Sequence, residues 1–241
     1  MADLYALEPD PDLPGLPGEP VIRDNEDQLL DVLSADVYLH ALNCVQRFGD
    51  FHMALAVGPF QERLCRRLMT DPQVRQLPWQ RTHLWAVHDE PDAVWGSRFT
   101  SIADLLEDHS GIPDSNVHLP DLDAEDPAGT YERRLQERLA WREKGHDRLD
   151  LAVLHLDAGG LVSGATHGTA GDQSPDALFV PRAEGGLAMS PRLLGATRLV
   201  AIAATGEANR AAITGLSDNP SVPTLAGGTL RWYVDRAACE N

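Results

Sequence analysis

The residues best suited to chemistry lie in the segment LAVLHLDAGGLVSGATHG, residues 151–168. His155 stands in its apolar run, Asp157 follows the end of that run, and His167 comes near the end of a glycine-rich stretch. Imidazole and carboxylate groups can move protons, and glycine-rich turns expose backbone N–H groups to anions. We expect His155 to be a core histidine with satisfied hydrogen bonds. His167 is expected to be an exposed loop residue, and the alternative is that a flexible loop brings it back over the site as a catalytic acid or base. Asp157 is then the best candidate in this segment for a carboxylate that takes part in a reaction.

A second acidic group, HDEPD at residues 88–92, follows another apolar run. Asp89 or Glu90 could transfer protons or orient a base, and either could form a pair of carboxylates with Asp157. His88, next to Asp89, is a further candidate for proton transfer. The alternative is a pair of solvated acids before a turn, because the proline that follows Glu90 favours an extended residue before it. The sequence leaves both interpretations open.

Other catalytic chemistries lack the residue spacing that they need. The cysteines Cys44, Cys65 and Cys239 form no C-x-x-C pair, and the chain has no H-x-x-x-H, H-E-x-x-H or G-x-S-x-G motif. The only lysine, Lys144, lies in a polar run and is expected to be solvated, which argues against Schiff-base chemistry. We therefore predict neither a metal ion nor a cofactor.

Composition limits the partners of the chain. With 241 residues and a net charge of −17, it is unsuited to a nucleic-acid backbone or an anionic membrane surface. An anionic ligand would need a local basic pocket. The first 20 residues are acidic and rich in proline, which predicts an irregular segment, a cytoplasmic protein and a single domain over residues 21–241. The sequence indicates no oligomeric state.

Strand-like and helix-like patterns alternate along residues 21–241, which predicts βαβ units and a mainly parallel sheet with helices on both faces. The first long helix should run from Asn25 through Gln46, with Leu39 and Leu42 among its periodic apolar positions. Ligands bind beyond the carboxyl ends of such strands, so site residues are expected in the turns that follow them. Strands are expected at residues 20–24, 51–57, 82–87, 149–156, 198–205 and 229–235, and further helices at 59–69, 101–109, 126–144 and 206–217.

Four segments carry a resemblance to a known family: IPDSNVH (112–118), LDLAVLHLDAGGLVSG (149–164), TGEANRAAI (205–213) and TLRWYVDRAA (229–238). In order and spacing they resemble motifs of the 6-phosphogluconolactonase and glucosamine-6-phosphate isomerase family. The similarity spans about residues 25–238. It implies a three-layer, modified Rossmann-like α/β domain that binds a phosphorylated sugar.

The resemblance also assigns ligand-binding positions. It places Gly58 in the first phosphate-binding turn, Ser97 after the acidic turn and Gly160 in the turn after residue 156, and Arg210 is the neighbouring cation that could grip a phosphate. Asp89 and Glu90 match the family's acidic pair if one residue is inserted.

Several positions of this sequence depart from the family's pattern. Pro59 and Phe60 stand where backbone N–H and hydroxyl groups bind phosphate, and Asn209 replaces a phosphate-facing lysine. Gly159 replaces an aspartate. Leu161 replaces the histidine that is expected to activate water against the lactone carbonyl. Loss of a general base typically costs about 10² to 10⁴ in rate.

These departures predict a 6-phosphogluconolactonase-like protein with impaired or absent catalysis. One alternative is a catalytically silent protein that keeps the fold for ligand binding or for interaction with a partner. Another is an enzyme like the glucosamine-6-phosphate isomerases and deaminases. The expected ligand is a phosphorylated sugar or a similar small anion, and neither nucleic acid nor a membrane is expected as a partner.

Overall fold

A parallel seven-stranded sheet forms the centre of the protein. The computed structural model describes residues 16–92, 96–140, 148–163, 175–182, 186–216, 222, 224–225 and 227–239. The strand order is β1-β12-β11-β8-β2-β3-β7, and every neighbouring pair is parallel. These strands are β1 (Glu19–Arg23), β2 (Phe51–Leu55), β3 (Thr82–Ala86), β7 (Val117–His118), β8 (Leu151–His155), β11 (Leu199–Ala204) and β12 (Thr229–Asp235).

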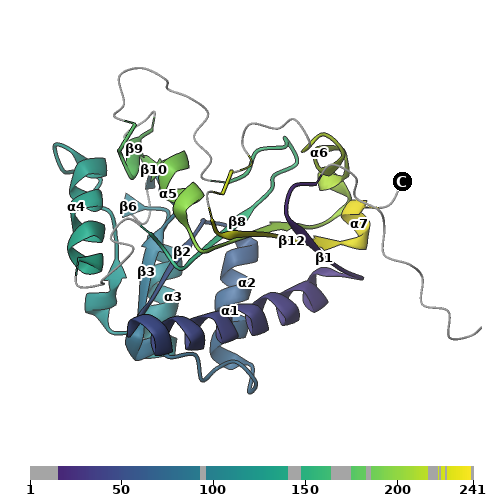
Figure 1. Ribbon diagram of the computed structural model, residues 1–241, viewed down its shortest axis with the longest axis horizontal. Helices are drawn as coiled ribbons and strands as arrows, with labels where there is room; N and C mark the ends of the chain where they lie inside the picture. Colours follow the sequence, from purple (N-terminus) through teal and green to yellow (C-terminus); the bar gives the residue numbers. More distant parts are fainter. Residues whose placement is uncertain are drawn as a thin grey trace, which may run out of the picture.

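Helices cover both faces of this sheet, which confirms the expected three-layer α/β architecture. In Figure 1, α1, α2 and α3 lie on one side of the sheet and α5 and α6 on the other. The helices are α1 (Glu26–Phe48), α2 (Pro59–Thr70), α3 (Thr100–Ser110), α4 (Pro127–Leu139), α5 (Pro191–Ala196), α6 (Arg210–Thr214) and α7 (Arg236–Cys239).

Short elements surround this framework. One small antiparallel sheet contains β4 (His88–Asp89), β10 (Leu187–Met189) and β9 (Phe179–Pro181), and another pairs β5 (Pro91–Asp92) with β6 (Gly96–Ser97). Within the described residues, 3-10 turns occupy Trp79–Arg81, Asp114–Asn116 and Glu207–Asn209.

The sequence explains both ends of α1. The Asn25 side chain accepts a hydrogen bond from the Gln28 N–H, and Gly49 ends the helix in the left-handed conformation. Leu39 and Leu42, however, are 56% and 40% exposed, because they lie outside the buried stripe of the helix. That stripe consists of Leu29, Leu30, Leu33, Ser34, Val37, Ala41 and Cys44.

The expected strands are confirmed, but several of them end earlier than the apolar runs suggest. β2 ends at residue 55 rather than 57, since the chain then turns at Gly58 into α2. The expected helix over residues 206–217 is a 3-10 turn followed by the five-residue α6. The description of α4 ends at Leu139, and residues 141–144 of the expected helix lie outside the described residues.

The direction of the chain across the sheet reverses between β2 and β8. From β2 the chain continues to β3 and β7 on one side, whereas from β8 it continues to β11 and β12 on the other. Such a switch point opens a crevice beyond the carboxyl ends of the two strands, where α/β proteins bind ligands. The order of the strands therefore directs the search for a site to this position.

At its beginning, the described chain is tied to the sheet. β1 starts at Glu19, one residue earlier than the expected strand, and the Trp232 indole N–H donates to the Pro17 carbonyl at 2.7 Å. Most of the expected irregular segment, residues 1–15, lies outside the described residues. No helix in the described part of the chain has the length and apolar character needed to cross a membrane.

Candidate functional site

A cavity of about 210 Å³ lies at the switch point, beyond the carboxyl ends of β2, β8 and β11. We call it the Gln61 cavity. Its wall combines the first turn of α2 with the ends of β8 and β11 and the turn after β11. The lining residues are Pro59, Phe60, Gln61, Arg63, His155, Leu156, Ala203, Thr205 and Asn209.

Three polar side chains of the cavity wall have unsatisfied hydrogen-bonding atoms. The Gln61 side chain is inaccessible to solvent, and neither its amide nitrogen nor its amide oxygen has a hydrogen-bond partner within the described residues. His155 Nδ1 and Asn209 Oδ1 are also buried atoms without a hydrogen-bond partner within the described residues. An unpaired buried polar group costs about 1–3 kcal/mol, and folded proteins keep few of them. Their concentration around one cavity is typical of a ligand-binding site.

Gly58 brings two of these side chains together. It precedes the first residue of α2, Pro59, and its φ of 166° is ordinary extended backbone. A Cβ atom at this position would lie 3.0 Å from Gln61 Oε1 and 3.2 Å from His155 Cε1. Glycine therefore favours close packing of the turn against β8, because a Cβ atom would require Gln61 and His155 to shift by a few tenths of an ångström. Backbone conformation does not require it.

His155 differs from the satisfied core histidine expected from the sequence. Its backbone N–H donates to Ser163 Oγ at 2.8 Å, whereas its Nδ1 atom is unpaired among the described residues. Burial lowers its pKa, and the nearby Asp157 carboxylate acts in the opposite direction. The imidazole is therefore neutral at pH 7 and can accept or donate a hydrogen bond in the cavity.

Among the described residues that line this cavity, the one arginine is already paired. Arg63 forms an ion pair with Glu26, and Glu26 also accepts a hydrogen bond from Thr205 Oγ1 at 3.1 Å. Arg210, expected from the sequence to bind phosphate, is not among the lining residues and donates from Nη2 to the Ala237 carbonyl of α7 at 3.0 Å. The charge available for a phosphate is therefore small.

The turn after β8 uses its carboxylate internally. Asp157 Oδ1 accepts hydrogen bonds from the Gly159 N–H at 2.8 Å and the Leu161 N–H at 2.9 Å, and Gly160 has a positive φ of 81°. The Leu161 residue is 44% exposed. Asp157 thus stabilises the turn. His167 lies outside the described residues.

The acidic pair of residues 89 and 90 also makes local interactions. The buried Asp89 carboxylate accepts hydrogen bonds from Ser97 Oγ at 2.5 Å and the Phe99 N–H at 3.0 Å. Burial raises its pKa, although these hydrogen bonds act to lower it. Glu90 lies 3.2 Å from an Arg182 guanidinium nitrogen. The hydrogen bonds of Asp89 therefore hold the segment of residues 97–99 in place. Asp89 and Asp157 share no hydrogen-bond partner among these contacts.

His88 also has a buried unpaired ring atom, Nδ1, among the described residues. Its pKa is lowered to about 3, first by burial and then by the positive charges of Arg182, His155 when protonated, and Arg98.

Gln61 was not expected in the site, because glutamine on an amphipathic helix is usually exposed. The available signal was its position in the first turn of the helix that follows Gly58, where the family resemblance places a phosphate-binding turn. Arg63, in the same helix, was also not expected in the site, because arginine on such a helix is usually exposed. Whether a particular side chain of that turn is buried depends on contacts with β8 that lie far along the chain.

Comparisons with known proteins place this arrangement in a family. The family model described as glucosamine-6-phosphate isomerases/6-phosphogluconolactonase matches residues 24–226. The human GDH/6PGL endoplasmic bifunctional protein is 28% identical over 239 residues, which cover 90% of this chain and 29% of that protein. The rabbit (Oryctolagus cuniculus) protein of the same name is 32% identical over 101 residues, 41% of this chain and 12% of its own. The chain thus spans less than a third of these relatives.

Solved structures share the fold over nearly the whole chain. A 6-phosphogluconolactonase from Thermotoga maritima has a TM-score of 0.70 at 22% identity and covers 90% of this chain and 100% of its own. The enzyme from Leishmania guyanensis has a TM-score of 0.70 at 16% identity, covering 94% and 99%. A monomeric glucosamine-6-phosphate deaminase has a TM-score of 0.70 at 14% identity, covering 91% and 98%. With the family model matching most of the sequence, the chain belongs to the family of glucosamine-6-phosphate isomerases and 6-phosphogluconolactonases.

Proposed function

We propose that this chain binds a small polyhydroxylated ligand, a sugar or sugar acid, in the Gln61 cavity, and that its hydrolysis of a sugar-phosphate lactone is impaired or absent. The observation that carries the proposal is the set of unpaired polar atoms on Gln61, His155 and Asn209 around one cavity. Amide and imidazole groups match hydroxyl groups, which both donate and accept hydrogen bonds. Because these atoms are covered in the ligand-free protein, their side chains must turn toward the cavity when the ligand binds. Membership of the family supports a sugar-type ligand.

A phosphate on this ligand should contribute less to binding than the hydroxyl groups do. Pro59 has no backbone N–H, and Phe60 presents an apolar ring near the start of α2. Arg63 could bind a phosphate only by giving up part of its ion pair with Glu26. We therefore expect the phosphorylated and unphosphorylated forms of one sugar acid to bind within tenfold of each other.

The turn after β8 supports impaired hydrolysis. Leu161 cannot accept a proton, and the Asp157 oxygen nearest to it already accepts two backbone hydrogen bonds. Without a general base, hydrolysis is expected to be about 10² to 10⁴ times slower, equivalent to a barrier about 3–5 kcal/mol higher.

A second candidate function is slow lactone hydrolysis with His155 as the general base. The support is its unpaired Nδ1 in the cavity wall and the burial that keeps the ring neutral. In this mechanism Nδ1 would accept a proton from water as the oxygen attacks the lactone carbonyl. Replacement of His155 by Asn would then abolish the residual turnover, and because Asn keeps a hydrogen-bonding amide at this position, gluconate binding would weaken less than in Gln61→Met.

Binding and turnover can be tested together on the full chain. Isothermal titration with gluconate and 6-phosphogluconate should give dissociation constants within tenfold of each other, and 6-phosphogluconolactone hydrolysis should be at least 100-fold slower than for an ordinary lactonase. Gln61→Met should weaken both ligands at least tenfold. The matched control is Gln136→Met, at an exposed position of α4. Ordinary turnover would refute impaired catalysis, and failure of both ligands to bind would refute the ligand assignment.

The remaining predictions of function stay open to separate tests. The deaminase-like and partner-interaction alternatives predict, respectively, ammonia release from glucosamine 6-phosphate and capture of a second protein. The cytoplasmic location also stays a prediction, since the human relative is named as an endoplasmic protein.

A further inference from the structure

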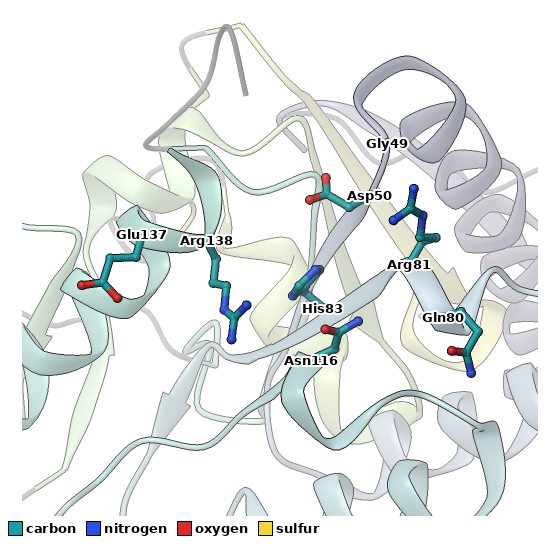
Figure 2. A pocket seen from close by; sticks show the side chains of 8 residues that line it. All are labelled: Gly49, Asp50, Gln80, Arg81, His83, Asn116, Glu137 and Arg138. Carbon is teal, nitrogen blue, oxygen red and sulfur yellow. The ribbon is translucent and has the colours of Figure 1, made fainter. Parts of the chain in front are cut away.

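A larger cleft, of about 500 Å³, lies at the opposite end of the sheet from the Gln61 cavity. We call it the amino-end cleft. Asp50 directly precedes β2, His83 is the second residue of β3, and Asn116 directly precedes β7. Because these strands are parallel, their amino-terminal ends lie side by side at the same end of the sheet. The last turn of α4 adds Glu137 and Arg138, and Arg81 precedes β3 (Figure 2).

Two arginines and a histidine give this cleft its chemistry. Arg81 and Arg138 are exposed, and Figure 2 shows Arg138 and Asn116 pointing toward His83, while the Glu137 carboxylate is turned away from that group. Arg138 makes a long hydrogen bond of 3.5 Å to the Ser115 carbonyl. A guanidinium has five N–H donors, and within the described residues most of those on Arg138 have no hydrogen-bond partner. The lining balances these two arginines with two acids, Asp50 and Glu137, so its formal charge is close to zero on a chain of net charge −17.

A network of aromatic side chains holds His83 in place behind the cleft. His83 Nδ1 lies 3.1 Å from Nε2 of the buried His118. The His83 ring also stacks on His52, with 4.4 Å between centroids and 6° between planes. The Trp85 indole N–H donates to His52 Nδ1 at 3.1 Å, and His52 Nε2 lies 3.1 Å from Asp50 Oδ2.

The hydrogen bonds of His52 determine which partner holds the Asp50 carboxylate. Because Trp85 has only a donor, His52 Nδ1 must be the acceptor, and the proton of the neutral ring is then on Nε2. That proton is donated to Asp50. The Asp50 carboxylate keeps its negative charge, because a neutral imidazole donates the hydrogen bond, but its side chain is only 6% exposed. An incoming anion therefore contacts the exposed Arg81 and Arg138 and the half-buried His83.

The same geometry argues against a metal ion, although ligand atoms of Asp50, His52 and His83 lie within 4.8 Å of one another. An imidazole binds a metal through a lone pair in the plane of its ring. Two stacked rings 6° from parallel cannot both direct such a lone pair at one ion. His52 Nε2 also carries its proton, and a metal ligand must be deprotonated.

We propose that the amino-end cleft binds a small anion with a phosphate or carboxylate group, through Arg81, Arg138, His83 and Asn116. This site is separate from the Gln61 cavity, because five-residue strands such as β2 span about 16 Å between the two ends of the sheet. A ligand here leaves the Gln61 cavity open and is therefore a second ligand of the protein. Bidentate recognition by two guanidiniums favours phosphate and carboxylate over halide.

The test is titration of the full chain with inorganic phosphate and, separately, with citrate at constant ionic strength. We expect at least one of them to bind with a stoichiometry of one. Arg81→Gln combined with Arg138→Gln should weaken that binding more than tenfold and leave gluconate binding at the other end unchanged. His83→Asn should weaken it at least threefold. Both arginines are exposed, so circular dichroism and Tm should match those of the parent.

Arg63→Gln is the matched control, because it removes the arginine of the Gln61 cavity and should leave phosphate and citrate binding unchanged. The proposal is overturned if neither anion binds, or if the double arginine variant binds as the parent does. It is equally overturned if Arg63→Gln abolishes binding, since the anion would then occupy the other cavity. Stoichiometric zinc binding that is lost in His83→Asn, without anion binding, would replace it with a metal site.

Discussion

Gly58 and Gln61 lie so close that a Cβ atom on residue 58 would be 3.0 Å from Gln61 Oε1. The same atom would be 3.2 Å from Cε1 of His155. The turn between β2 and α2 therefore holds a buried amide against the end of β8, and a side chain at residue 58 would require Gln61 and His155 to shift. The spacing of these groups defines the site as much as their chemistry does.

Gly58→Ala tests that spacing. The extended φ of 166° accommodates alanine, so the added methyl group acts through contact alone. Gln61 and His155 must move by a few tenths of an ångström, and we expect gluconate to bind at least fivefold more weakly, with about 1–2 kcal/mol lost from the free energy of unfolding. Titration and urea unfolding measure the two effects. Gly227→Ala, where a Cβ would meet open space, should change neither. Unchanged gluconate binding in Gly58→Ala would show that the ligand does not contact this wall.

Gln61→Met tests whether the buried amide is kept for binding. Methionine has nearly the same length and no polar atoms that need partners, so the substitution removes two unsatisfied groups. We expect the ligand-free protein to gain about 1–3 kcal/mol in the free energy of unfolding while ligand binding is lost. Urea unfolding with and without gluconate gives both values. A destabilised Gln61→Met protein would mean that the amide has a structural partner.

The fold could be predicted because its signals are local. The apolar runs of β8 and β12 and the glycine–proline turn before α2 depend on residues close in sequence, and the structure confirms these elements. Leu39 and Leu42 show where this fails. Their apolar character contributes to a helical pattern, but their exposure depends on the face of α1 that meets the sheet.

The candidate site was predictable only in its location. The strand order places it beyond β2 and β8, and Gly58 was expected there. The roles of the individual acids could not be predicted. A carboxylate next to a turn can stabilise that turn, as Asp157 does. It can also be buried against a later segment, as Asp89 is against Ser97. His155 faces a cavity because of Gly58, which lies almost one hundred residues earlier in the chain.

The double substitution Gly159→Asp with Leu161→His restores the side chains that the family pattern places in the turn after β8. We expect lactonase activity to rise less than tenfold. A Cβ at residue 159 would lie 3.2 Å from Asp157 Oδ1, so the new aspartate strains the turn and repels the existing carboxylate. Residue 161 is also 44% exposed and does not line the Gln61 cavity. A 6-phosphogluconolactone assay measures the outcome, and a rise of 100-fold or more would show that the turn alone limits catalysis.

The buried His118 should make stability depend on pH in acid. Burial, followed by the nearby His83 and His52, lowers its pKa from 6.5 to about 2. Between these values the unfolded chain binds a proton at this residue and the folded protein does not. The free energy of unfolding therefore falls as the pH falls below about 6.5, by up to about 1.4 kcal/mol per pH unit from this residue.

His118→Phe removes this proton and keeps a ring beside Trp85, on which His118 stacks at 3.9 Å. At pH 7 the variant should be less stable than the parent by about 1 kcal/mol, because it loses the hydrogen bond to His83. Its stability should fall less steeply in acid, so that the two curves cross between about pH 6 and pH 5. Urea unfolding at half-unit intervals from pH 7 to pH 4.5 measures this. His118→Gln, which lacks the ring but is also unable to titrate, should show the same reduced slope. Parallel curves for the parent and both variants would mean that His118 takes up its proton in the folded state.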